Sequence, residues 1–141
     1  MVNKTLDKFF SIIEREGYFS NRKRFEFAAK QLYGSIDSFK DKRVLDIGGG
    51  NGVYSIYALC MGASELVNVE PLLDGSTETR SKEFHNIIKE MNFSNASLES
   101  ATFQEYKNKG SKFDIILSHA SINHLDEEAC INLKKDKKIY L

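Results

Sequence analysis

Apolar residues in the first forty positions recur at helical spacing. Phe9 and Ile13 fall on one side of a helical wheel, with charged residues elsewhere on it, and the pattern ends at Gly17. Such a pattern predicts an amphipathic helix. A second helix with an apolar face is predicted over residues 21–33. We expect these helices to form an N-terminal extension over residues 1–40 that covers the rest of the chain.

Beyond residue 40, short apolar runs alternate with helical patterns. Strand–helix alternation implies right-handed crossovers and a parallel sheet. The sequence therefore predicts an α/β fold over residues 41–141. Strands are predicted over 43–47, 65–70, 97–103 and 113–118, and helices over 52–61, 76–91 and 126–133.

Composition and charge narrow the class of protein. The 141 residues are 41% hydrophobic, which suits one folded domain. Twenty basic residues balance twenty acidic ones, so the chain has no overall electrostatic signature for nucleic acid. The basic clusters at 22–24 and 134–138 are typical of solvated helix faces. Apolar runs are too short for a membrane span, and no signal peptide is visible.

The two cysteines are Cys60 and Cys130, far apart in the sequence and without C-x-x-C spacing. We expect buried free thiols in a reducing, cytoplasmic environment. No histidine, cysteine and carboxylate cluster has the spacing of a metal site, so no metal is predicted.

The most informative segment is a glycine-rich turn between a strand and a helix. Asp46 stands near the end of the predicted strand, and Gly48, Gly50 and Gly52 follow in the pattern D-x-G-x-G-x-G. Glycine lets the backbone turn sharply and lets a ligand approach the main chain. The dinucleotide pattern G-x-G-x-x-G has no register here, which disfavours a nucleotide-binding oxidoreductase.

The turn resembles the first motif of the class I S-adenosylmethionine-dependent methyltransferases, and the resemblance covers about residues 40–134. It implies a Rossmann-like sheet with strand order 3-2-1-4, helices on both faces and S-adenosyl-L-methionine as cofactor. It implies that Gly48, Gly50 and Gly52 let the cofactor approach the backbone closely. Asp46 is expected to act indirectly in cofactor binding, by ordering the loop and polarising contacts to the cofactor's ammonium group. The family carries an acidic residue after the second strand that binds the ribose hydroxyls, and Glu70 stands there.

Later positions extend the resemblance with one departure. Where the family has an acidic residue near the adenine, this chain has Thr102 followed by Phe103, which we expect to contact the base. The fourth predicted strand matches the family's F-D-x-apolar-apolar signature and runs into Ser118, a further implied cofactor contact. His119 and His124 follow, as in the branch of the family that acts on small molecules. Each histidine is a catalytic candidate or a hydrogen-bonded structural group.

The resemblance implies methyl transfer to a small-molecule acceptor. The balanced charge and the lack of a proline-rich motif after the fourth strand disfavour a nucleic-acid partner, and no membrane partner is expected. A general base is needed only if the acceptor must lose a proton, and His124, with a pKa near neutrality, is the best candidate. A methylated base oxygen or ribose stays open as an acceptor.

The family domain has seven strands, and the sequence predicts only four. We therefore expect a domain truncated after the fourth strand, whose uncovered edge invites self-association. A fragment of a longer protein, a natural truncation and an edge covered by another chain stay open. The alternative function is a cofactor-binding module or remnant without independent catalytic activity.

Overall fold

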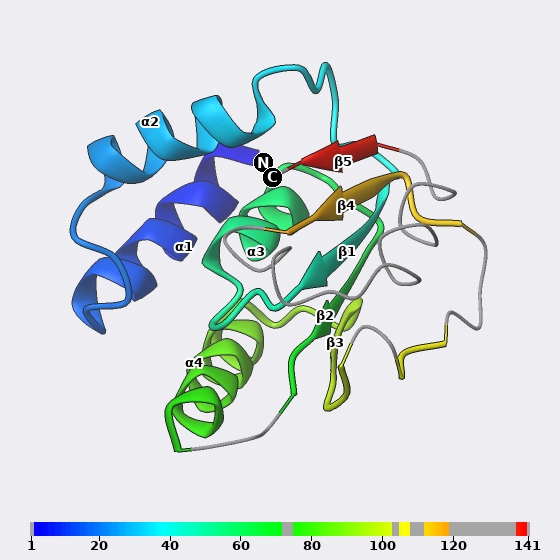
Figure 1. Ribbon diagram of the computed structural model, residues 1–141. Helices are drawn as coiled ribbons and strands as arrows, with labels where there is room; N and C mark the ends of the chain where they lie inside the picture. The colour runs from blue at the N-terminus through cyan, green and yellow to red at the C-terminus, as the bar shows by residue number, and fades with distance from the viewer. Residues whose placement is uncertain (1, 72–74, 103–104, 108–111, 119–137, 141) are drawn as a thin grey trace.

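A parallel five-stranded sheet forms the centre of the molecule (Figure 1). The computed structural model describes residues 2–71, 75–102, 105–107, 112–118 and 138–140. The strand order is β3-β2-β1-β4-β5, which confirms the predicted Rossmann-like order 3-2-1-4. The strands are β1 (Arg43–Ile47), β2 (Glu65–Val69), β3 (Ala96–Glu99), β4 (Ile115–Leu117) and β5 (Lys138–Tyr140); the helices are α1 (Val2–Arg15), α2 (Arg22–Tyr33), α3 (Val53–Cys60) and α4 (Gly75–Met91).

The ends of the first two helices follow from local chemistry. Gly17 has a φ of 73°, which lets Tyr18 N donate to Ile13 O at 2.8 Å and ends α1. The side chain of Asn21 accepts from Arg24 N at 2.9 Å and caps the start of α2. The two predicted N-terminal helices are thus present.

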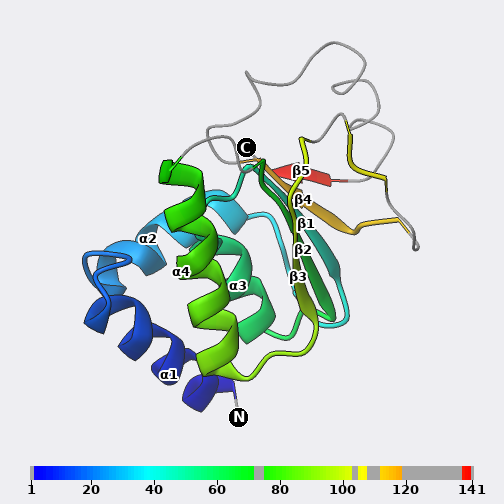
Figure 2. The same ribbon diagram turned by 90° about the horizontal axis from the view of Figure 1, so that it is seen from below.

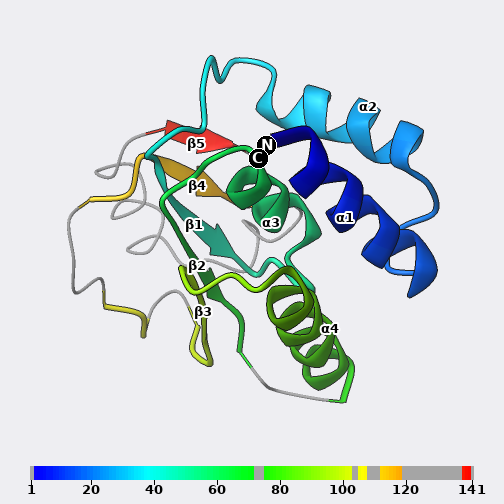
Figure 3. The ribbon, with the colours of Figure 1, turned by 180° about the vertical axis from the view of Figure 1, so that it is seen from behind.

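All four described helices lie on one face of the sheet, with α3 and α4 against the strands (Figures 2 and 3). One apolar cluster joins α1 and α2 to α3, α4 and the sheet. At its centre Phe25 is fully buried, with its ring stacked at 5.0 Å from that of Tyr54. The predicted helix over 126–133 lies outside the described residues, so a helix on the second face stays a prediction.

Both faces of the central strands are buried. Val44 and Leu66 belong to the cluster on the helix-covered face, whereas Leu45 and Val67 belong to a second cluster on the opposite face. Nearly continuous apolar strands of this kind are typical of parallel sheets in α/β proteins.

The prediction that β4 ends the sheet with an uncovered edge is wrong. β5 pairs with β4 in parallel, with Ile116 opposite Ile139. Unpaired strand N–H and C=O groups favour such an addition. The sequence signal was missed because only a three-residue apolar run, 139–141, follows the basic cluster at 134–138. Self-association through an open β4 edge therefore loses its basis.

The first basic cluster has a structural role. Arg22 forms ion pairs with Asp7 at 2.7 Å and Glu26 at 2.8 Å, and its guanidinium lies 4.5 Å from the centre of the Phe10 ring. These contacts fasten α2 to α1.

Two further sequence expectations concern cysteine and the membrane. Cys60 is a buried free thiol, and its burial raises the pKa of the thiol to about 12. Cys130 lies outside the described residues. Within the described ranges, every helix is too short or too polar to cross a bilayer.

Candidate cofactor site

The glycine loop joins β1 to α3 in a conformation that ordinary residues avoid. Gly48, Gly50 and Gly52 have φ values of 63°, 61° and 71°. Each lies in the left-handed region, where a Cβ atom is disfavoured. Gly48 N donates to Val69 O at 2.8 Å, which ties the loop to the end of β2. The three predicted glycines are therefore required by the backbone itself.

Close packing adds a second requirement for glycine. A Cβ atom on Gly49 would overlap the carboxylate of Asp46, and one on Gly52 would lie 2.6 Å from Phe84 Cδ2. Gly49 was not among the predicted site residues, although its place in a run of three glycines was a signal for it. The loop thus packs directly on the side chain of Asp46.

Asp46 is a buried carboxyl group with one unused oxygen. Its side chain is 2% exposed, and Oδ2 accepts from Ser55 Oγ at 2.6 Å. Oδ1 is buried without a hydrogen-bond partner in the described part of the chain. Burial raises the pKa of Asp46 to about 7; the Ser55 bond lowers it, and the charge of Glu70 raises it.

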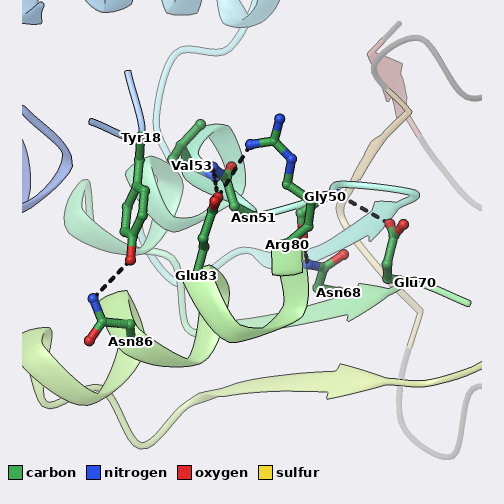
Figure 4. A network of polar contacts seen from close by, with 9 residues as sticks. All are labelled: Tyr18, Gly50, Asn51, Val53, Asn68, Glu70, Arg80, Glu83 and Asn86. Atoms are coloured by element: carbon green, nitrogen blue, oxygen red, sulfur yellow. Dashed lines mark hydrogen bonds and ion pairs between the residues drawn. The ribbon is translucent and has the colours of Figure 1, made fainter. Parts of the chain in front are cut away.

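The end of β2 holds the Gly50 peptide from both sides (Figure 4). Glu70 Oε2 accepts from Gly50 N at 3.1 Å, and Asn68 Nδ2 donates to Gly50 O at 3.3 Å. Asn68 stands opposite Asp46 in the strand register, and among described residues its buried Oδ1 has no hydrogen-bond partner. Burial raises the pKa of Glu70, while the hydrogen bond from Gly50 lowers it. Sequence reasoning missed Asn68, which interrupts an apolar strand.

A polar link connects the loop to α4. Asn51 Nδ2 donates to Glu83 Oε2 at 2.9 Å, and Arg80 Nη1 donates to the same oxygen at 3.2 Å (Figure 4). Asn51 Oδ1 also accepts from Val53 N at 3.4 Å, at the start of α3. Further along α4, Asn86 donates to Tyr18 at 3.0 Å. No local motif marks Arg80 or Glu83, so nothing in the sequence pattern distinguishes them from other charged residues of the helix.

These groups surround a pocket of about 210 Å³ at the carboxyl end of the sheet. Sites that enclose a whole small-molecule ligand have roughly 300–1,000 Å³, so this pocket matches one end of such a ligand. Its position fits the rule that open parallel sheets bind ligands beyond the carboxyl ends of their strands. It is lined by Asp46, Gly48, Gly49, Gly50, Asn51, Val53, Tyr54, Arg80 and Leu117.

The other predicted site residues differ in how they relate to the pocket. Gly52 and Glu70 bond to the loop without lining the pocket, and Ser118 is buried directly after β4. Thr102 Oγ1 accepts from Glu105 N at 3.3 Å, so this hydroxyl oxygen stabilises the turn that Thr102 begins. The candidates that lie outside the described residues are Phe103, His119 and His124.

The buried acceptors at this end of the sheet suit a ligand that supplies hydrogen-bond donors. Buried oxygens without a partner favour a ligand that supplies hydrogen-bond donors, because an unmet buried acceptor costs free energy. The described residues contain no group of three or more histidine, cysteine or acidic side chains that could hold a metal ion. The ammonium and the ribose hydroxyls of S-adenosylmethionine are donors of the kind that the buried acceptors require.

Comparisons with known proteins give the same fold. No protein-family model matches the chain, and a search of curated proteins finds no match. Among solved structures, a candidate RNA methyltransferase of Pyrococcus horikoshii is 26% identical, with a TM-score of 0.51 over 66% of this chain and 44% of its own. The PRMT1 enzyme–prozyme complex of Trypanosoma brucei with AdoHcy is 27% identical, with a TM-score of 0.53 over 64% of this chain and 27% of its own.

A third similar structure is a precorrin-6y C5,15-methyltransferase of Geobacter metallireducens. It is 17% identical, with a TM-score of 0.63 over 85% of this chain and 59% of its own. The chain thus spans between about a quarter and three fifths of the length of these three structures. The name of the first of these structures refers to RNA and that of the third to a precorrin, so the acceptors named differ.

Proposed function

We propose that this chain binds S-adenosylmethionine and transfers its methyl group to a small-molecule acceptor. The observation that carries the proposal is the contact between Glu70 and Gly50 N, which joins the acid after β2 to a three-glycine loop in the left-handed conformation. This arrangement lies at the carboxyl edge of a sheet with the methyltransferase strand order. A domain of residues 41–141 and a cytoplasmic location belong to the proposal.

The residues of the chain act by binding and positioning. When bound, the cofactor supplies a reactive methyl on a good leaving group, so the protein's task is alignment and exclusion of water. Glu70 offers carboxylate oxygens to the ribose hydroxyls while Gly50 N fixes its orientation. Asp46 packs against the loop, and its buried Oδ1, which has no hydrogen-bond partner among the described residues, accepts from a donor of the ligand. The glycines at 48 and 50 line the pocket with backbone alone.

A small acceptor is favoured by the charge of the chain. With zero net charge, the protein lacks the positive field that nucleic-acid binding uses. His124, and less so His119, is proposed as a base for hydroxyl acceptors. Thr102, Phe103 and Ser118 complete the proposed cofactor contacts.

A cofactor-binding module without activity of its own is the second candidate. It is favoured because the contacts seen in the structure, such as the hydrogen bond from Gly50 N to Glu70, concern cofactor binding, whereas His119 and His124 lie outside the described residues. The two candidates predict the same binding but different turnover.

The test uses S-adenosylmethionine with a tritiated methyl group. The chain is incubated with a metabolite extract, with total RNA or with protein, and label is counted in each fraction. Label in small molecules other than S-adenosylmethionine and its breakdown products, separated by chromatography, and in no RNA or protein, supports the proposal. Label in RNA or protein contradicts the acceptor class, and cofactor binding without label in any fraction supports the module.

A further inference from the structure

The pocket at the glycine loop carries opposite charges on different walls. Asp46 comes from β1, and Arg80 comes from α4; among the described residues that line the pocket, these two are acidic or basic. The α-amino-acid end of a ligand carries both an ammonium and a carboxylate. A pocket of about 210 Å³ with one group of each sign matches that end in size and in charge.

The geometry around Arg80 favours binding of a second carboxylate. Glu83 Oε2 holds Arg80 Nη1 at 3.2 Å and is itself fixed by Asn51 Nδ2. The side chain of Glu83 is 20% exposed, whereas that of Arg80 is 55% exposed. A guanidinium has five N–H donors in a planar fork. Arg80 can therefore donate to Glu83 from one nitrogen and to a ligand carboxylate from its other N–H groups.

At Asp46 the pocket has an acceptor that needs a hydrogen-bond donor from the ligand. Asp46 Oδ1 is buried without a hydrogen-bond partner in the described residues, and Oδ2 already accepts from Ser55. An ammonium at Oδ1 would satisfy this acceptor. The order of charges across the pocket then places a ligand carboxylate on the side of Arg80.

We infer that Arg80 is a specificity-determining residue of this pocket, whose guanidinium, oriented by Glu83, binds the carboxylate of the cofactor's amino-acid end. The inference rests on the proposed function and deepens it, because nothing in the sequence pattern assigns Arg80 to the cofactor. It predicts that the chain distinguishes S-adenosylhomocysteine from 5′-methylthioadenosine, which has the same nucleoside but lacks the amino-acid end.

Calorimetric titration of both compounds into the wild type and into Arg80→Met tests the inference. Arg80→Met removes the charge and keeps the length of the side chain. We expect it to weaken S-adenosylhomocysteine about tenfold to a hundredfold, the effect of a lost charge-assisted hydrogen bond. Affinity for 5′-methylthioadenosine should not change. The control is Lys82→Met on the same helix, whose side chain is 77% exposed and which we expect to bind both compounds as the wild type does.

The outcomes separate the inference from the function on which it rests. If Arg80→Met weakens the binding of both compounds by the same factor, or weakens neither, Arg80 does not bind the carboxylate and the inference is overturned. If the wild type binds neither compound, the proposed function fails with it. Arg80→Lys, which keeps a cation, should recover part of the affinity for S-adenosylhomocysteine; a wild type with equal affinity for both compounds overturns the inference without any variant.

Discussion

At the amino end of the sheet an ion pair joins β1 to β2, whereas at the carboxyl end acceptor groups lie together that form no ion pair with any described residue. Arg43 begins β1 and Glu65 begins β2, and Arg43 Nε lies 2.6 Å from Glu65 Oε2. The guanidinium of Arg43 also lies 4.3 Å from the centre of the Phe113 ring. At the other end of the same two strands stand Asp46 and Glu70.

The amino end also has a hollow, of about 470 Å³, which includes Arg43 and Glu65 in its lining. Its size alone would favour it as a binding site. Its charges, however, already neutralise each other, and ligands of open α/β sheets bind at the carboxyl ends of the strands.

The difference shows where the fold keeps unmet polar groups. At the carboxyl end, Asp46 Oδ1 and Asn68 Oδ1 are buried acceptors without a hydrogen-bond partner among the described residues. At the amino end, Arg43 Nη1 is such a donor, but its guanidinium lies over an aromatic ring. Departures from local rules concentrate at functional sites, where a ligand supplies the missing partner.

The largest effect is expected from Gly52→Ala at the carboxyl end. The alanine would have to adopt the left-handed conformation of Gly52, and its Cβ would lie 2.6 Å from Phe84 Cδ2. Strain and overpacking together should lower the free energy of unfolding by about 2–5 kcal/mol. Urea denaturation measures this loss. Gly17→Ala, with φ of 73° but nothing within 4 Å of its Cβ, is the control and should cost only the conformational part.

Asp46→Asn should stabilise the protein as the pH rises. The pKa of Asp46 is about 7 when folded, against 3.8 as the ordinary value, so between these pH values the folded state keeps a proton that the unfolded chain has released. Stability of the wild type therefore falls from about pH 4 to pH 7 and then levels. Asn removes this loss, a gain on the order of 2–4 kcal/mol at pH 8 relative to pH 4.

Urea denaturation at pH 4 and pH 8 checks this expectation, with the exposed Asp37→Asn as control. An Asp46→Asn gain that is the same at both pH values would contradict a buried, protonated carboxyl group. At pH 8, where Asp46 is ionised, the same variant should bind S-adenosylhomocysteine more weakly, because a neutral amide attracts an ammonium less than a carboxylate does.

The smallest effect is expected at the amino end, from Glu65→Ala. The ion pair with Arg43 is short, but the Glu65 side chain is 41% exposed and solvent screens the interaction. We expect a loss of about 0.5–1 kcal/mol in the free energy of unfolding, smaller in high salt. Denaturation at low and high salt measures it. A loss above that at Gly52 would reverse the comparison between the two ends.

The sequence was sufficient for features that depend on local patterns. Periodic apolar residues located α1, α2 and α4, and the spacing of glycines after Asp46 located the loop. Glu70 was placed by its position after β2, and Gly50 N does contact its carboxylate.

Long-range features could not be read in the same way. Arg80 reaches the pocket only because α4 packs beside the glycine loop, and a single charged residue on an amphipathic helix is indistinguishable from a solvated one. β5 was missed because three residues carry too little periodicity, and its pairing with β4 depends on the whole sheet.

The most direct test of the central claim compares the two acids at opposite ends of β2. S-adenosylhomocysteine is titrated calorimetrically into the wild type, Glu70→Ala and Glu65→Ala. If the carboxyl end binds the cofactor, Glu70→Ala weakens binding by about 1–3 kcal/mol, the scale of a lost charged hydrogen-bond partner, and Glu65→Ala binds as the wild type does. Unchanged affinity in Glu70→Ala, or an equal loss in both variants, would contradict the account.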